Sequence, residues 1–341
     1  MEDNTKKTLL LAGAAGLGAL LAVRTFTNRK REFSFTDRTV LITGGSRGLG
    51  LVLARMFAEQ GANIAICSRT QHQLDAAKAE LEAGGATVLA FNCDVRDRGQ
   101  VKAMIQEIKE RVGPVEVLIN NAGIITAGPL EEMRVEDFEE AMRVHYWAAL
   151  YTMLEVLPEM KARGEGRIVN IASVGGKVSV PHLVPYSGSK FALVGMSEGF
   201  RSELLKDGVY VTTINPGLMR TGSARNAFLK GQNKKEYSLF SLIDANPMIS
   251  LAADRAAREI IDACRYGKSE VTLGLNAKFI STLHGLFPGA TADLMGLVHL
   301  FLPGPGGIGS EAVRGYESET ELTQSALNAP NQKAARENNE M

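Results

Sequence analysis

A tyrosine and a lysine four residues apart have the types and spacing needed for proton transfer. They enclose the run Tyr186-Ser187-Gly188-Ser189-Lys190 at the start of a helix-like segment, and residues four apart share one face of a helix. A phenol has a pKa of about 10 and is a poor base at neutral pH, but a nearby ammonium favours the phenolate and lowers that pKa. Tyr186 and Lys190 are therefore candidates for a proton donor and acceptor.

A serine supplies a further polar group for such a site. Ser173 comes just after a strand-like run at residues 167–171, and open α/β sheets bind ligands at the carboxyl ends of their strands. A tyrosine and a lysine at this spacing occur often by chance, so the surrounding elements must support the assignment.

A glycine-rich turn offers a binding surface for phosphates. The run Thr43-Gly44-Gly45-Ser46-Arg47-Gly48-Leu49-Gly50 lies between a strand-like and a helix-like segment. Glycines permit a tight turn and let the backbone approach a pyrophosphate, while the helix N-terminus supplies N–H groups. An ordinary turn is the alternative, and the second strand at the expected distance favours dinucleotide binding.

The end of the second strand bears on which dinucleotide is bound. It reads Cys67-Ser68-Arg69, without the Asp or Glu that accepts hydrogen bonds from the ribose 2′-hydroxyl of NAD. Arg69 and Arg47 could flank a 2′-phosphate instead, since a guanidinium binds phosphate well. We therefore expect NADP(H) rather than NAD(H); two solvated surface arginines are the alternative.

The elements that position these residues alternate between strand and helix from Thr39 to about Asn215. Buried strands separated by helices predict a parallel sheet covered on both faces, and right-handed crossovers make it one doubly wound, Rossmann-type α/β domain. The predicted strands are 39–43, 63–67, 87–91, 115–120, 167–171 and 209–215, and the predicted early helices are 50–60 and 71–83.

From these motifs the chain resembles the short-chain dehydrogenase/reductase family over about residues 35–273. The motifs occur in the family's order: Thr43 to Gly50, Asp94-Val95, Asn120-Asn121-Ala122-Gly123, Asn170-Ile171-Ala172-Ser173, Tyr186 to Lys190, and Asn215-Pro216-Gly217 with Thr221 beyond. The resemblance implies that Tyr186 is the general acid in carbonyl reduction and the base in alcohol oxidation. It also implies that Lys190 lowers the pKa of Tyr186 and holds the nicotinamide ribose.

The resemblance further implies that Ser173 bonds the substrate oxygen and stabilises developing charge. It suggests a cofactor site made of the glycine turn, residues beside adenine and its ribose, and residues at the nicotinamide end. These are Gly44, Ser46, Arg47, Gly48, Leu49, Gly50, Arg69, Asp94, Val95, Asn121, Ala122, Gly123, Tyr186, Lys190, Pro216, Gly217 and Thr221.

One position departs from the family pattern. After Val144 the family usually has an Asn that supports a water linking the lysine to solvent, whereas this chain has His145. A histidine can also hold water or pass protons, because it titrates near neutral pH. A tolerated replacement, an altered relay and impaired catalysis are the three interpretations, and the intact Ser173, Tyr186 and Lys190 argue against the third.

The two ends differ from the middle. An uncharged apolar run at Thr8–Val23, with basic residues on both sides, predicts a membrane anchor within residues 1–34 and places the catalytic domain on the cytoplasmic side. A cleaved signal peptide and a buried helix in a soluble cytoplasmic protein are the alternatives. Residues 274–303 form an apolar helical extension, whose face from Leu294 to Leu302 would pack on the domain or lie on a membrane. Residues 304–341 are expected to form a mobile, disordered tail.

Composition narrows the classes of protein. Lys plus Arg and Asp plus Glu both number 38, so the chain lacks the basic surplus of a nucleic-acid binder. Its three cysteines have no metal-ligand spacing, and we expect no metal site. The leading interpretation is an NADP(H)-dependent oxidoreductase that interconverts a carbonyl and a secondary alcohol of a lipophilic molecule at a membrane. A cofactor-binding scaffold or sensor with little turnover is the rival. The family resemblance implies a homodimer or homotetramer.

Overall fold

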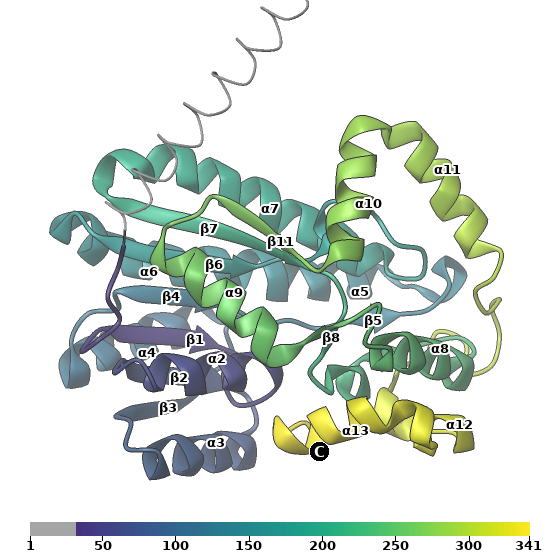
Figure 1. The fold of residues 1–341 in the computed structure, drawn as a ribbon, viewed down its shortest axis with the longest axis horizontal. Coiled ribbons are helices and arrows are strands. Elements are labelled where there is room, and N and C mark those ends of the chain that lie inside the picture. Colours follow the sequence, from purple (N-terminus) through teal and green to yellow (C-terminus); the bar gives the residue numbers. More distant parts are fainter. Residues whose placement is uncertain (1–31) are drawn as a thin grey trace, which may run out of the picture.

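The computed structural model describes residues 32–341, so the predicted anchor at residues 8–23 lies outside the described residues. Its centre is a seven-stranded sheet with the order β11-β7-β6-β4-β1-β2-β3, in which every pairing is parallel (Figure 1). The strands are β1 (Thr39–Thr43), β2 (Asn63–Ser68), β3 (Val88–Asn92), β4 (Val117–Asn120), β6 (Gly166–Ile171), β7 (Val209–Pro216) and β11 (Glu270–Leu273).

Helices cover both faces of this sheet. One face carries α2 (Gly48–Ala58), α3 (Gln71–Ala83) and α9 (Ala253–Arg265), and the other carries α4 (Arg98–Val112), α6 (Ala148–Arg163) and α7 (Val184–Leu204). This is the doubly wound, single-domain arrangement that the sequence predicts.

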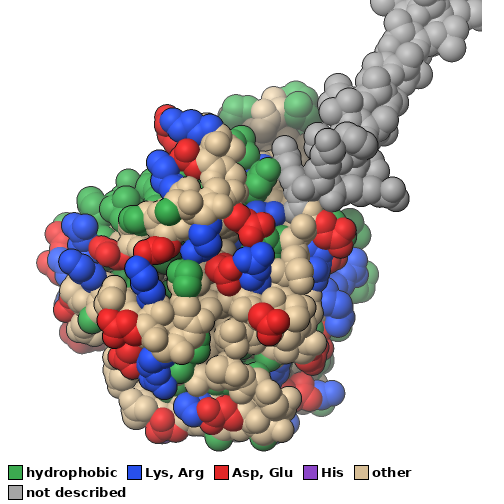
Figure 2. Space-filling model, turned by 90° about the vertical axis from the view of Figure 1, so that its left-hand side faces the viewer, with side chains coloured by type: hydrophobic (Ala, Val, Ile, Leu, Met, Phe, Trp, Pro, Cys, Tyr) green, Lys and Arg blue, Asp and Glu red, His purple; other side chains and the backbone are tan. Residues whose placement is uncertain are grey.

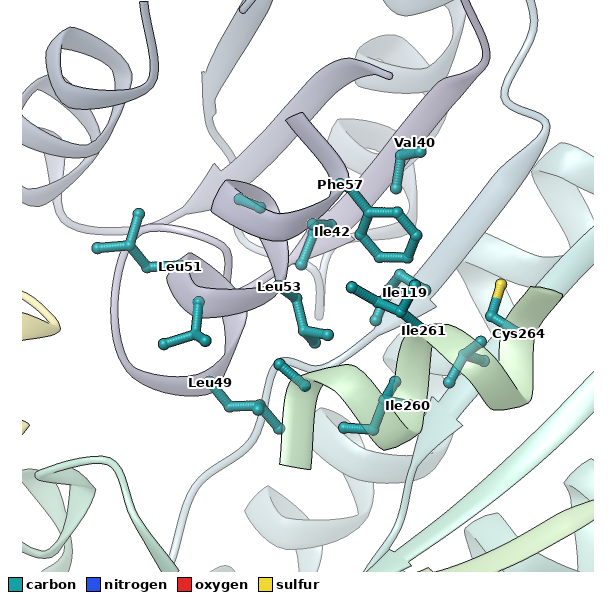
Figure 3. Packing of buried hydrophobic residues seen from close by; sticks show 14 of the residues in the cluster. Val40, Ile42, Leu49, Leu51, Leu53, Phe57, Ile119, Ile260, Ile261 and Cys264 are labelled. Atoms are coloured by element: carbon teal, nitrogen blue, oxygen red, sulfur yellow. The ribbon is translucent and has the colours of Figure 1, made fainter. Parts of the chain in front are cut away.

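The strand β1 shows why the sheet needs two covering layers. All five of its residues are buried, and successive side chains of a strand point to opposite faces. Val40 and Ile42 join the core beneath α2 and α9, whereas Leu41 joins the core on the other face. Figure 3 shows Ile42 and Phe57 packed with Ile261 in the first of these cores.

Shorter elements extend the structure beyond the carboxyl end of the sheet. They comprise α8 (Asn233–Ala245), a three-stranded sheet and a two-stranded sheet. The first of these sheets contains β5 (Thr126–Ala127), β9 (Phe228–Leu229) and β12 (Val313–Arg314), and the second contains β8 (Met219–Arg220) and β10 (Leu251–Ala252). A small core around the buried Tyr237 holds this region together.

A helical hairpin follows the last strand of the main sheet. Its helices, α10 (Leu275–Leu286) and α11 (Pro288–His299), project from the body of the molecule (Figure 1). Many of its large apolar side chains are exposed, and they are Leu275, Phe279, Leu286, Phe287, Leu294, Leu297, Val298, Leu300 and Phe301. Within residues 32–341, no helix combines the length and apolar character that crossing a membrane requires.

The expectation of a disordered tail at residues 304–341 differs from the structure. This segment contributes β12, α12 (Glu321–Gln324) and α13 (Ala329–Glu337), and it packs against α8. Polar side chains make the attachment: the Ser241 hydroxyl donates to Asn328 Oδ1 (2.9 Å), and Asn331 Nδ2 donates to the Ser241 carbonyl (2.8 Å). Because amide hydrogen bonds rather than an apolar stripe fix the segment, hydrophobic periodicity gives no sign of it.

The surface mixes charges of both signs. On the face that Figure 2 draws, acidic and basic side chains alternate, with apolar side chains between them. This agrees with the equal numbers of acidic and basic residues in the sequence.

Candidate active site

The three residues predicted to carry the chemistry come from the end of β6 and the start of α7. Ser173 follows β6, Tyr186 lies in the first turn of α7, and Lys190 lies one turn later. A Cβ added at Gly175 would lie 3.2 Å from the Tyr186 ring and 3.4 Å from the Ser173 hydroxyl. The absence of a side chain at Gly175 therefore lets the tyrosine and the serine lie side by side.

Lys190 is buried and anchored to the sheet. Its Nζ donates to the carbonyl oxygen of Ile171 (2.8 Å), at the end of β6, and lies 5.6 Å from the centre of the Tyr186 ring. Burial lowers the pKa of the Lys190 ammonium to about 7. At neutral pH, Lys190 is thus poised between its charged and neutral forms.

The pKa of Tyr186 differs from the expectation drawn from the sequence, in which Lys190 lowers it. In the structure, burial raises the pKa of this phenol, and the hydrogen bond with the Ser173 hydroxyl acts in the opposite direction without cancelling it. The physical reason is desolvation, which disfavours the phenolate and the lysine ammonium alike. A lysine that is only partly protonated gives the phenolate correspondingly less support.

His145 is buried in a turn of π-helix (Arg143–Trp147) that joins α5 (Val135–Met142) to α6. Its Nε2 accepts a hydrogen bond from the N–H of Ile124 (3.1 Å), and its Nδ1 lies 2.7 Å from Ser189 Oγ. The Ser189 hydroxyl donates its proton to the Tyr186 carbonyl (2.8 Å). Ser189 Oγ is therefore the acceptor toward His145, and Nδ1 carries the proton between them. Since Nε2 acts as an acceptor and carries no proton, this hydrogen-bond network assigns a neutral imidazole.

The surroundings of His145 keep it neutral. Burial holds the pKa of the imidazole well below its usual range, and the nearby Lys190 adds to this effect. Both ring nitrogens bond protein groups, one beside the Asn120–Gly123 motif and one on α7. This geometry favours a structural role for His145 over the proton relay considered from the sequence.

The glycine-rich turn is fastened to the end of β4. The Thr43 hydroxyl oxygen accepts from the N–H groups of Asn121 (3.0 Å) and Ala122 (3.1 Å), and Asn121 Nδ2 donates to the carbonyls of Thr43 and Gly44. A Cβ on Gly50 would lie 2.2 Å from the Gly44 carbonyl oxygen. Only glycine at position 50 allows α2 to begin so close to this turn.

The other predicted cofactor residues follow the carboxyl ends of parallel strands, and so lie along one edge of the sheet. Arg69 follows β2 and is exposed, while Asp94 follows β3 and pairs with Arg96, which lowers the pKa of its carboxyl. Pro216 ends β7, and Thr221 beyond it is buried. Arg47, at the start of α2, does not stand free, because it pairs with Glu340 (2.9 Å). Sequence reasoning missed this partner, since nothing in the polar C-terminal stretch signals it.

A buried histidine–glutamate pair was also missed. His182 lies in the loop before α7 with a φ of 63°, and its Nδ1 is 2.7 Å from Glu236 Oε1 on α8. Both residues are almost fully buried, and within the described part of the chain His182 Nε2 has no hydrogen-bond partner. The pair joins the loop that precedes Tyr186 to helix α8.

Comparisons with known proteins agree with this geometry. The short chain dehydrogenase family matches residues 38–231. The chain is 38% identical over 184 residues to ketoacyl reductase HetN of Nostoc sp., which covers 54% of this chain and 64% of that relative. It is 30% identical over 283 residues to 3-ketodihydrosphingosine reductase of Mus musculus, with 81% of this chain and 83% of the relative covered.

A solved structure shares the fold. L-sorbose reductase from Gluconobacter frateurii, determined with NADPH and L-sorbose, aligns with a TM-score of 0.64 at 26% identity. The alignment covers 71% of this chain and 97% of that protein. With the matched motifs and the parallel sheet, these findings identify the chain as an oxidoreductase of the short chain dehydrogenase family, whose members use a nicotinamide cofactor.

Proposed function

We propose that this protein is an NADP(H)-dependent reductase that interconverts a ketone and a secondary alcohol on a lipophilic molecule. The observation that carries the proposal is the grouping of the buried Ser173 and Lys190 with the half-buried Tyr186 at the carboxyl edge of the sheet. A scaffold without turnover would have no need of all three groups.

The residues around the glycine turn fit a dinucleotide. Among the described residues, the buried Ser46 Oγ has no hydrogen-bond partner, so it can bond a cofactor oxygen. Helix α2 directs its N-terminal N–H groups to the same place. Ser68 ends β2 where an NAD-binding site would carry a carboxylate, and Arg47 and Arg69 flank the turn. This set supports NADP(H), because guanidinium groups favour a 2′-phosphate.

The chain's own residues then divide the work of the reaction. When bound, NADPH supplies the hydride. Ser173 holds the substrate oxygen, and Tyr186 donates its phenolic proton to that oxygen as negative charge develops there. A protonated Lys190 favours the phenolate that remains, and thereby opposes the effect of burial on Tyr186.

Two observations support a lipophilic substrate. The relatives include a ketoacyl reductase and a 3-ketodihydrosphingosine reductase, whose names describe a ketone on an acyl group and a ketone on a sphingoid base. The hairpin of α10 and α11 exposes apolar side chains, such as Phe279 and Leu297. It lies near the site region, because the ring of His299 is 5.4 Å from that of His182, in the loop before Tyr186. A ketone on a long acyl or alkyl chain is accordingly the substrate class that we propose, taken up at a membrane surface.

The test removes only the proton-transferring hydroxyl. Purified Tyr186→Phe should oxidise NADPH with long-chain 3-ketones at least about a hundredfold more slowly than the parent, because general acid catalysis is lost. NADPH binding should be retained. Tyr151→Phe, which removes a hydroxyl from α6 outside the site, is the matched control and should keep the parent rate.

Near-parental turnover by Tyr186→Phe would contradict the proposed mechanism. Turnover with NADPH on polar sugars but not on long-chain ketones would contradict the proposed substrate class while leaving the chemistry intact.

A further inference from the structure

The last residues of the chain lie on the glycine-rich turn. Gly48, the first residue of α2, donates its N–H to the carbonyl of Asn338 (2.8 Å). Asn339 Nδ2 donates to the carbonyls of Ser46 (2.9 Å) and Gln73 (3.1 Å). Figure 1 shows how α13 brings the chain's end back toward α2 and α3.

A carboxylate of this segment lies at the start of α2. Glu340 is 6% exposed, and its Oε2 is 2.9 Å from Arg47 Nη1 and 2.7 Å from Asn226 Nδ2. A Cβ added at Gly48 would lie only 2.4 Å from Glu340 Oε1. The carboxylate therefore touches the glycine at a helix N-terminus, a position that favours anions.

The same segment also reaches the loop after β7. Asn338 Nδ2 donates to the carbonyl of Thr221 (3.4 Å), and a Cβ on Gly222 would lie 2.4 Å from Ala335 Cα. The chain's end thus spans from the turn after β1 to the loop after β7. Gly48 and Thr221 belong to the set that the sequence assigns to the cofactor.

Resting on the proposed function, we propose that residues 338–341 form a plug on the dinucleotide phosphate surface, and that the cofactor binds only when the plug leaves. A phosphate at the start of α2 would need the Gly48 N–H that Asn338 now occupies. It would also meet the Glu340 carboxylate at the same glycine, and two anions repel each other there. The C-terminal segment and the dinucleotide therefore compete for one surface.

The first test compares NADPH affinities by fluorescence titration of the full chain, a chain ending at Glu337, and Glu340→Lys. If only a fraction of the protein is in the state that can bind NADPH, the apparent Kd equals the intrinsic Kd divided by that fraction. The chain that ends at Glu337 should bind NADPH at least about tenfold more tightly than the full chain. The same gain is expected for Glu340→Lys, because a lysine at this position is repelled by Arg47. Glu337→Lys is the matched control. The Glu337 carboxylate pairs with the exposed Lys333 on the surface, and the NADPH affinity of this variant should stay within about twofold of the parent's.

The second test follows the chain's end directly. Carboxypeptidase should remove Met341 and Glu340 slowly from the full chain, and several-fold faster when saturating NADPH is present; mass spectrometry measures both rates. Without cofactor, Glu340→Lys should be digested faster than Glu337→Lys.

Equal NADPH affinities of the full and shortened chains, or a digestion rate that NADPH leaves unchanged, would overturn the plug while leaving the proposed function standing. Failure of every variant to bind NADPH and NADH would instead contradict the proposed function, and the competition with it.

Discussion

Replacing Lys190 by Met should stabilise the protein in acid more than in alkali. The gap between the usual lysine pKa of 10.5 and the pKa of about 7 that burial imposes on Lys190 corresponds to about 5 kcal/mol, at about 1.4 kcal/mol for each pKa unit. Losing the hydrogen bond to the Ile171 carbonyl offsets about 2 kcal/mol of that gain. Lys190→Met should therefore be more stable than the parent by about 3 kcal/mol at pH 6.

The sign of the pH dependence follows from the two states of Lys190. Below pH 7 the ammonium is charged in both states, and the folded protein bears the full cost of burying it. As the pH rises from about 7 toward 10.5, the folded protein loses this proton while the unfolded chain keeps it, so the cost is relieved. By pH 9 the advantage of Lys190→Met should have fallen by about 3 kcal/mol, to near zero.

Urea unfolding at pH 6, 7, 8 and 9 measures this difference, because titrating groups remote from Lys190 affect parent and variant alike. His145, whose pKa Lys190 helps to lower, is held neutral mainly by its own burial. Lys206→Met, at an exposed lysine, is the control and should show no such trend. A free-energy difference between Lys190→Met and the parent that is constant across this range would refute the lowered pKa.

Further predictions concern the cofactor, His145, the membrane and the turn before β7. NADPH should bind more tightly than NADH, and Ala at both Arg47 and Arg69 should narrow that gap; equal affinities in the parent would contradict the assignment. His145→Asn and His145→Leu should give pH–rate profiles that superimpose on the parent's, because the imidazole stays neutral. The Leu variant should lose about 1–3 kcal/mol of stability in urea, since the N–H of Ile124 and Ser189 Oγ lose a partner. If the parent's rate changed with pH below neutrality and both variants abolished that change, the result would support the proton relay instead. The full chain should stay in the membrane pellet after a carbonate wash, whereas a form starting at Phe33 should be extracted more easily; complete solubility of the full chain would rule out the anchor. Gly208→Ala should lower the thermal midpoint markedly, because its Cβ would lie 2.0 Å from the Gly164 carbonyl oxygen; an unchanged midpoint would contradict this packing.

The central sheet could be predicted because its signals are local. The runs at residues 39–43 and 71–83 match β1 and α3 to the residue, and other strand ends shift by one or two residues. Two-residue strands such as β8 and β9 were not predicted, because so short a pairing leaves no periodicity to detect. The π-helical turn at Arg143–Trp147 also has no distinctive pattern of its own.

Some features of the site could likewise be predicted from local sequence, and others could not. Ser173, Tyr186 and Lys190 stand in local motifs, so their types and spacing are enough to predict them as site residues. The rise in the pKa of Tyr186 depends instead on how deeply the whole fold buries it. The pairing of Arg47 with Glu340 joins residues 293 positions apart through polar contacts, and no local rule relates such distant side chains.

The long separation in sequence between Arg47 and Glu340 also means that the glycine turn is made well before the C-terminal segment that covers it. Ribosomes make proteins from the N-terminus, at about 5–20 residues per second, and folded units form as they emerge. All seven strands of the main sheet end by Leu273, so the glycine turn can be complete while Asn338 to Met341 have yet to be added. If the glycine turn binds the dinucleotide as we propose, this surface is open on the nascent chain, and the dinucleotide can load there before the segment that later covers it has been made.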